Sequence, residues 1–274
     1  NTNISGVCTA TSFVPTEGQL SNRNIIINGA MQVAQRGTTS GVEGYSTIDR
    51  FSNEEGSCDE APTQSQHGLN SADTGPWAEG FRNSFHIQNG NQTSGAQAAN
   101  FIKLTYQVEA QDMANSGWNY TSSSSYITLS FWVRSSVAQN FYGRLTTHDG
   151  TAQNYPFETG SLSTNTWTKI TKKIPGNSNI SIDNNNGAGL GLEWMTYRGG
   201  NTTASGVALD TWAAYASGTR TPDQTSTWFT TNDATFEVTG VQLEVGSYAT
   251  PFEHRIFADE LARCQRYFYM IADG

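Results

Sequence analysis

The chain has 274 residues, enough for one large β domain or two smaller domains with a substantial core. Only 14% of the residues are charged and the formal net charge is −9. We therefore expect no nucleic-acid partner and no electrostatic docking on an anionic membrane, because both need clustered Lys and Arg. No apolar run reaches the roughly 18 residues of a membrane span, so no membrane insertion is expected.

The first 22 residues differ from the rest of the chain. Larger residues, Val7, Thr9, Thr11 and Phe13, alternate with small ones over a stretch too short to build a sheet of its own. Such a strand needs partners, most simply from identical chains, and we expect a three-chain β stalk. Because the chain begins at Asn1, we also expect a longer precursor.

From residue 23 onward the dominant period is two, the pattern of half-buried strands. The predicted strands cover residues 24–33, 81–88, 101–108, 126–135, 139–147, 166–174, 188–197 and 234–246. Residues 52–80 and 199–233 alternate little and are predicted to be long loops. The apolar positions of the last strand change parity between Val238 and Val241, which predicts a β-bulge at Thr239-Gly240.

The closing segment has helical spacing instead. Phe257, Leu261, Cys264 and Phe268 form one apolar stripe, which predicts an amphipathic helix over about residues 256–270 with its charges mostly off the stripe. His254 precedes it at a strand-to-helix corner and has no evident catalytic partner, so we expect it to bond backbone. The segment is predicted to be the C-terminal lock of the domain or of a trimer.

These elements predict an all-β, two-sheet sandwich of the jelly-roll type. The expected organisation is a stalk strand in residues 1–22, then a jelly-roll head in residues 23–274 that ends in the short helix. The three cysteines, Cys8, Cys58 and Cys264, are odd in number and far apart, without metal or redox spacing. We expect them to be reduced and structural.

Several stretches together carry a family resemblance: NRNIIINGAMQVAQRGTT, GYSTIDRF, YITLSFWVRSS, TWTKITKKIPG and TFEVTGVQLEVGSYATPFEHRIFADELARCQRYF. They resemble the C-terminal domain of bacteriophage tail-fibre-like virion proteins, especially those of marine and cyanobacterial phages. SGVCTATSF, residues 5–13, is similar to the last of the repeats that form the fibre shaft in that family.

The resemblance implies a homotrimer, made in the host cytoplasm and assembled into the virion. Its shaft joins other virion tail proteins through a preceding part, and its distal jelly-roll head, similar to carbohydrate-binding modules, contacts the host surface. The resemblance brings no catalytic residues. This sequence departs from the family pattern in the loops near residues 52–80 and 176–210, so the resemblance does not imply which ligand this chain binds.

Glycan recognition needs flat apolar faces together with amide and carboxylate groups. The predicted aromatic contacts are Trp77, Trp118, Tyr120, Trp212, Tyr215 and Trp228, and the predicted polar contacts are Asp73, Asn115, Asn119, Asp210, Asp223 and Asn232. The alternative for each single aromatic residue is packing in the core.

Catalysis is not expected. The acidic pairs Glu54-Glu55 and Asp59-Glu60 are sequence neighbours that should point apart in a polar loop, whereas a glycosidase needs carboxylates that face each other. DNNNG at residues 183–187 could offer calcium oxygens from Asp183 and Asn185, but the twelfth position of an EF-hand loop, a Glu, is here Trp194, so a polar turn is expected. No cofactor or metal is predicted.

The sequence thus predicts a trimeric, non-enzymatic receptor-binding fibre tip that attaches a virion to host surface polysaccharide or lipopolysaccharide. Two alternatives stay open. One is a purely structural appendage of a capsid or baseplate, and the other is a polysaccharide depolymerase whose site lies between subunits.

Overall fold

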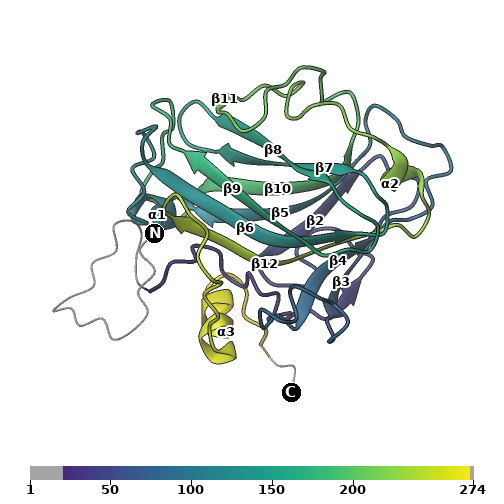
Figure 1. Cartoon of the computed structure of the whole chain (residues 1–274), viewed down its shortest axis with the longest axis horizontal. Helices are drawn as coiled ribbons and strands as arrows, with labels where there is room; N and C mark the ends of the chain where they lie inside the picture. Colours follow the sequence, from purple (N-terminus) through teal and green to yellow (C-terminus); the bar gives the residue numbers. More distant parts are fainter. Residues whose placement is uncertain (1–20, 272–274) are drawn as a thin grey trace, which may run out of the picture.

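A computed structural model describes residues 21–271, so the predicted stalk strand and Cys8 lie outside the described residues. The described chain forms two antiparallel six-stranded sheets that pack face to face (Figure 1). It is an all-β sandwich of the jelly-roll type, as the sequence predicted. No helix among these residues is long and apolar enough to cross a membrane.

Sheet 1 has the strand order β1-β3-β4-β12-β6-β9, and sheet 2 has the order β11-β8-β7-β10-β5-β2. The strands of sheet 1 are β1 (Thr39–Ser40), β3 (Thr63–Gly68), β4 (Asn83–Gln88), β12 (Thr235–Val245), β6 (Tyr126–Ser135) and β9 (Thr168–Pro175). The strands of sheet 2 are β11 (Ala213–Ala214), β8 (Gln153–Ser161), β7 (Asn140–Thr147), β10 (Ala188–Arg198), β5 (Phe101–Glu109) and β2 (Phe51–Gly56). Three short helices complete the fold: α1 (Ala110–Ala114), α2 (Thr227–Thr230) and α3 (Phe257–Gln265).

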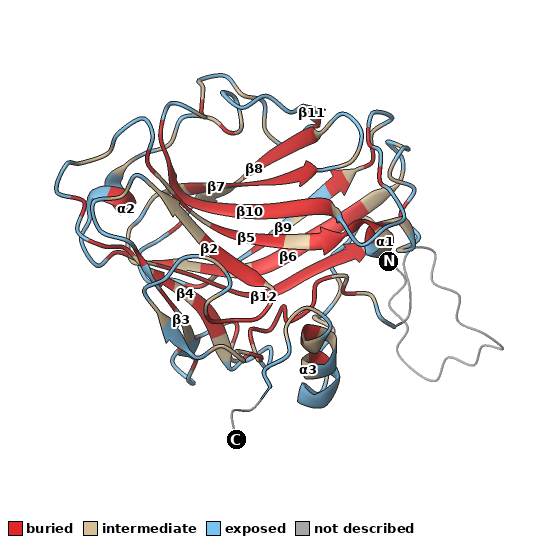
Figure 2. Ribbon diagram, turned by 180° about the vertical axis from the view of Figure 1, so that it is seen from behind, coloured by how far each residue is buried: buried red, intermediate tan, exposed pale blue. Residues whose placement is uncertain are grey.

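The core lies between the sheets, where the apolar face of each strand meets the other sheet (Figure 2). Phe131 from sheet 1 packs edge-on against Trp194 from sheet 2, with ring centroids 5.4 Å apart. Both side chains are fully enclosed, so each removes a large apolar surface from water. The strands predicted from residue 81 onward are present, and the core-facing residues of β5, β6 and β12 have the parity that the sequence predicted.

The predicted bulge in β12 is confirmed. The register between β12 and β6 shifts between Thr239 and Gln242, and Gly240 has a φ of +63°. A Cβ on Gly240 would lie 2.6 Å from a ring atom of the buried Phe81. Two separate features therefore require glycine at this position: the left-handed backbone and the close approach of the Phe81 ring.

The predicted strand at residues 24–33 is wrong. Asn28 and Met31 have φ values of +62° and +58°, which interrupt an extended chain. The Asn28 side chain stabilises this turn, since its amide donates to the backbone carbonyls of Val33 and Asp49 and its oxygen accepts from Val33 N–H. The segment lies along β12 as irregular backbone: Ile25 N–H donates to the Leu243 carbonyl, and Val241 N–H donates to the Gly29 carbonyl.

The prediction that residues 52–80 form one long loop is also wrong, because β2 and β3 lie there. Both strands lie at or next to a sheet edge and are rich in polar residues, with the sequences FSNEEG and TQSQHG. They therefore lack the apolar alternation from which strands were predicted. Strand β8 and helix α1 were not predicted. Residues 199–233 are mostly loop, as predicted, apart from β11 and α2.

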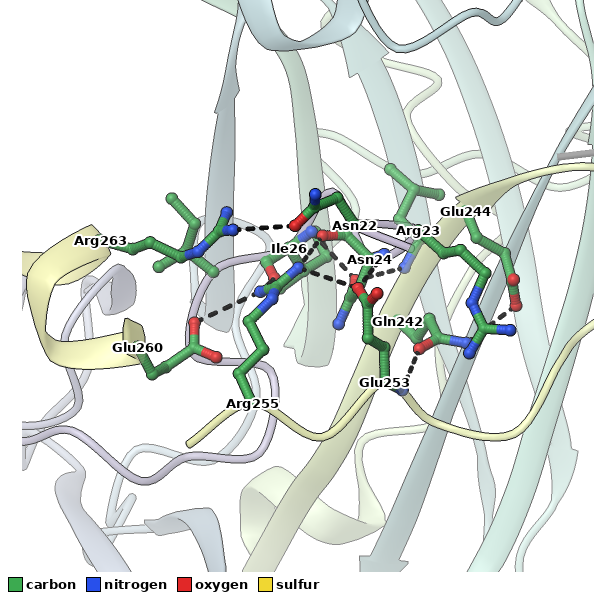
Figure 3. Close-up of polar contacts among 12 residues, drawn as sticks. Asn22, Arg23, Asn24, Ile26, Gln242, Glu244, Glu253, Arg255, Glu260 and Arg263 are labelled. Carbon is green, nitrogen blue, oxygen red and sulfur yellow. Dashed lines mark hydrogen bonds and ion pairs between the residues drawn. The ribbon is translucent and has the colours of Figure 1, made fainter. Parts of the chain in front are cut away.

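The closing segment binds the start of the described chain, and we call these contacts the clasp (Figure 3). The Arg255 guanidinium donates to the backbone carbonyls of Asn24 and Ile26 and lies 3.4 Å from a Glu260 carboxylate oxygen. Glu260 in turn accepts a 2.6 Å hydrogen bond from the Asn28 backbone N–H. As predicted, His254 bonds backbone, with Nε2 2.7 Å from the Glu79 carbonyl oxygen.

The helix is shorter than predicted, and the face that it buries differs from the predicted apolar stripe. Cys264 is buried against Ile27 and Val33, but Phe257, expected on the apolar stripe, is 55% exposed. Glu260, expected off the stripe, is buried instead. The clasp explains this correction, because Arg255 and the Asn28 N–H satisfy a carboxylate that would otherwise be costly to bury.

Candidate functional site

The predicted glycan-contact residues do not gather at one place. Trp118, Trp212 and Trp228 are buried in the main core, as the core-packing alternative foresaw, so they offer a ligand no free ring face. Their indole N–H groups are also used, since each donates to a backbone carbonyl: those of Ser125, Pro175 and Thr235 respectively. The remaining candidates lie in separate regions.

Asp73 and Trp77 lie in the loop that covers the outer face of sheet 1. The buried Asp73 carboxylate accepts hydrogen bonds from Arg134 (2.6 Å) and from Trp167 Nε1 (3.1 Å). Trp77 is half-buried, and the Arg82 guanidinium stacks 3.7 Å from its ring centroid. This loop therefore closes the outer face of sheet 1 with internal contacts.

Under the same loop, Arg134 also pairs with the buried Glu237 of β12 at 2.7 Å. Burial opposes the ionisation of Glu237, but the facing His86 ring, the Arg134 charge and the Ser84 hydroxyl outweigh it. Together they lower the pKa of Glu237 to about 2. These ion pairs join β6, β12 and the loop that carries Asp73.

The other polar candidates are exposed but dispersed. Asn119 and the half-buried Tyr120 lie beside Trp118 in the loop after α1, where Asn115 donates to Asn184 Oδ1. Asp223 accepts a hydrogen bond from the Thr203 hydroxyl, and Asn232 lies at the turn before β12. Asn115 and Asn232 line two different pockets.

Tyr215 and Asp210 flank the second sheet. Both come from the segment that runs beside β8 in Figure 1, and Asp210 pairs with Lys172 at 3.4 Å. Tyr215 is 36% exposed, and its ring centroid lies 5.5 Å from the Arg144 guanidinium carbon and 5.6 Å from that of Arg220. Tyr215 is thus the predicted aromatic residue best placed to meet a ligand.

The outer face of sheet 2, beneath Tyr215, is the candidate site, and we call it the sheet-2 face. It is formed by the residues of β2, β5, β10 and β7 that alternate with the core residues: Glu54, Lys103, Thr105, Gln107, Gly191, Glu193, Tyr142, Arg144 and Thr146. Cross-strand pairing sets them in rows, so that Thr105, Glu193 and Arg144 lie side by side.

Glu193 is the centre of a fixed charge network. Arg144 donates to both of its carboxylate oxygens, at 2.7 and 2.8 Å, Lys103 Nζ lies at 3.1 Å and Arg198 at 3.4 Å. Burial would raise the pKa of Glu193, but the hydrogen bonds and charge of Arg144, with Lys103 and Arg198, hold it far below the usual range. The carboxylate therefore stays ionised and its neighbours stay oriented.

The ion pairs of this network hold its charged groups in fixed positions. Lys103 Nζ lies between two carboxylates, 2.9 Å from Glu54 Oε2 and 3.1 Å from Glu193 Oε1. A glycosidase acid must hold a proton near neutral pH, and Glu193 cannot do so. Glu193, Arg144, Thr105 and Thr146 are themselves buried. The groups of this face that a sugar hydroxyl could meet are the half-buried ones around them, on Glu54, Lys103, Gln107 and Tyr142.

Sequence reasoning missed the sheet-2 face although its signal was present. The predicted strands contained Lys103, Tyr142 and Glu193 at the parity opposite to the core residues. What the sequence lacked was the order of the strands, which decides which polar positions become neighbours. Glu54 was not predicted as a site residue because its strand, β2, was predicted to be a loop. In β2 the Glu54 side chain points away from that of Glu55, as expected for adjacent strand residues.

The described residues contain no group of three or more His, Cys, Asp or Glu side chains that could hold a metal ion. At the predicted polar turn, Asp183 N–H donates to Asp149 and Gly187 N–H donates to Asn185 Oδ1. Cys58 and Cys264 are free thiols. Burial is the main cause that raises both of their pKa values, that of Cys58 to about 12.

No protein-family model matches the sequence, and no curated protein matches it either. Among solved structures, the enzymatically active domain of tailspike protein 4 of bacteriophage CBA120 is similar over 81% of this chain and 21% of that chain, at 10% identity and a TM-score of 0.39. This chain therefore spans about a fifth of that protein.

Two binding modules are similar over nearly their whole length. The N-terminal cellulose-binding domain of β-1,4-glucanase C from Cellulomonas fimi matches 80% of this chain and 99% of its own, at 8% identity and a TM-score of 0.36. A family 11 carbohydrate-binding module from Clostridium thermocellum matches 76% and 94%, at 11% identity and 0.32. At such identities the likeness concerns the fold.

Proposed function

We propose that this chain is a receptor-binding head of a phage tail fibre, which binds host surface glycan on the sheet-2 face without cleaving it. The observation that carries the proposal is the ion-paired polar floor around Glu193 with the exposed Tyr215 at its rim. Pre-oriented hydrogen-bonding groups beside an aromatic ring suit a sugar, which presents hydroxyls at its edge and C–H groups on its faces. The sequence resemblance to tail-fibre proteins supports the viral setting.

We further propose that the head is a homotrimer in the virion. Support comes from exposed large apolar side chains around α3 and the chain end: Ile256, Phe257, Tyr269, Met270 and Ile271. An exposed apolar cluster of this kind is typical of an interaction surface. Three weak sugar sites on one rigid assembly would raise avidity well above that of a single site.

The same apolar cluster favours the second candidate, a structural virion appendage with no ligand of its own. The two are separated by retention of the purified protein on a panel of bacterial envelope polysaccharides, with each polymer sized afterwards. Selective retention that falls in Tyr215→Ala, while Asn232→Ala behaves like the unmodified protein, is the expected result.

Each other outcome decides against the proposal in a different way. No retention on any polymer by a folded protein would support the structural appendage. Shortened polymer would make the protein a depolymerase. Retention that is unchanged in both Tyr215→Ala and Lys103→Ala would show that the ligand binds somewhere other than the sheet-2 face.

A further inference from the structure

A pocket of about 520 Å³ opens where the sheet-2 face meets the closing segment of the chain. Gln107 and Glu109 from the end of β5 form one side of it, and residues 186–188, before β10, form another. Arg50, Arg266 and Tyr267 complete its lining together with Val108. We call it the Arg50 pocket. Gln107 belongs to both the pocket and the sheet-2 face, so the two are continuous.

The backbone and the side chain of Arg50 are both fixed by neighbouring residues. It is a non-glycine residue with a φ of +72°, a strained backbone that the surrounding structure must maintain. Its guanidinium carbon lies 3.5 Å from the Tyr267 ring centroid and 5.1 Å from that of Tyr106, and the group donates to the Gln107 carbonyl. The stacking leaves the edge of the guanidinium as its hydrogen-bonding side.

Two polar atoms at this pocket, Arg50 Nε and Gln107 Oε1, are enclosed and have no hydrogen-bond partner within residues 21–271. One is a donor and the other an acceptor. Both atoms are closed off from the pocket, so a ligand would instead meet the exposed Arg266 guanidinium and the accessible edge of Arg50. A sugar acid suits these groups, because its carboxylate accepts from guanidinium N–H groups and its hydroxyl groups can both donate and accept.

Arg266 supplies the second cation. Its side chain is 53% exposed and forms a 2.7 Å ion pair with Glu109, whose own side chain is nearly buried. Two arginines and one glutamate leave the pocket lining one positive charge in excess. This local excess differs in sign from the net charge of −9 on the whole chain.

We propose that the Arg50 pocket receives the carboxylate of an acidic sugar, such as a uronic acid, in a glycan that lies across the sheet-2 face. The proposal rests on the proposed function and names the chemical class of its ligand. The planar guanidinium matches a carboxylate, with which it forms paired hydrogen bonds. A single excess positive charge suits a monoanion better than a phosphate dianion, which Glu109 would repel more strongly.

The acidity of the whole chain does not oppose this binding at physiological salt. Charges in solution are screened beyond about 8 Å, so a bound carboxylate senses the pocket more than distant surface acids. Screening therefore weakens the repulsion from distant acids more than the short contacts between the carboxylate and the pocket arginines.

The experiment uses the whole chain and two probes of one backbone: oligogalacturonate and the same oligosaccharide with its carboxyl groups reduced to alcohols. Dissociation constants are measured by calorimetry for the unmodified protein and for Arg266→Gln, Arg50→Lys and Arg263→Gln. The last removes the same charge from α3 at a residue outside the pocket, so it is the matched control. Melting temperature checks that each variant is folded.

We expect the acid form to bind at least tenfold more tightly than the reduced form. Arg266→Gln should remove about tenfold of the affinity for the acid form only, and Arg50→Lys at least as much, because Lys lacks the planar fork. Arg263→Gln should bind like the unmodified protein.

Equal affinity for the acid and reduced forms would overturn this inference and leave the proposed glycan binding intact. An equal loss in Arg263→Gln and Arg266→Gln would overturn it too, because it would show a general charge effect. Binding of neither probe, in a protein retained on other envelope polysaccharides, would refute the acidic-sugar class. No binding to any polysaccharide would refute the proposed function itself.

Discussion

Replacing Arg255 with Leu tests whether the clasp holds the ends of the domain together. The side chain is 8% exposed, and its removal strands the Glu260 carboxylate, which is 6% exposed, along with the carbonyls of Asn24 and Ile26. Breaking one partner out of a buried ion pair costs about 3–5 kcal/mol. Glu253, the other carboxylate near Arg255, is less enclosed and adds little.

We therefore expect Arg255→Leu to lower the free energy of unfolding by about 4 kcal/mol, a large part of the roughly 5–15 kcal/mol that holds a typical domain. Urea unfolding followed by tryptophan fluorescence and by circular dichroism measures the loss. Arg255→Leu combined with Glu260→Gln should recover part of it, because the second change removes the stranded charge.

The matched control is Lys169→Ala, which breaks an ion pair with Glu79 in which both side chains are about one third exposed. Such a surface pair should be worth less than about 1 kcal/mol. If Arg255→Leu cost no more than this control, the clasp would not be a stabilising element and our account of the buried Glu260 would fail.

Three further predictions concern the helix, the bulge and acid stability. Leu261→Asp places a charge in the apolar seam under α3 and should impair assembly, seen by sedimentation, before glycan retention; normal assembly with lost retention would contradict the role of the lock. Gly240→Ala should destabilise by about 3 kcal/mol, because its Cβ meets Phe81 at a positive φ, and a loss below about 0.5 kcal/mol in urea unfolding would contradict this. Since the pKa of Glu237 is lowered from its usual 4.5 to about 2, its contribution to stability is present above pH 4.5 and is lost as pH falls toward 2. Glu237→Gln should flatten that part of the stability profile, and an unchanged profile would show that Glu237 is not responsible.

The sequence by itself determined the class of fold, because a period of two is a local property of each strand. Residues 126–135 alternate so regularly that the predicted strand and β6 share the same bounds. The bulge in β12 was visible for the same reason, as a change of parity along one strand. The corner role of His254 also followed from local sequence.

Only the tertiary structure decided which polar groups meet. Residues 24–33 look like a strand, but Asn28 bonds across a turn to Val33 and Asp49, and those partners are set by the packing of the whole domain. Glu260 is buried because Arg255 and the Asn28 N–H reach it from outside its helix. The sheet-2 face and the Arg50 pocket arise in the same way, since they join β2, β5, β10, β7 and the chain end. Strand order and long-range charge compensation are not properties of any local pattern, and so the sequence could predict the sandwich but not the place on it where a ligand would bind.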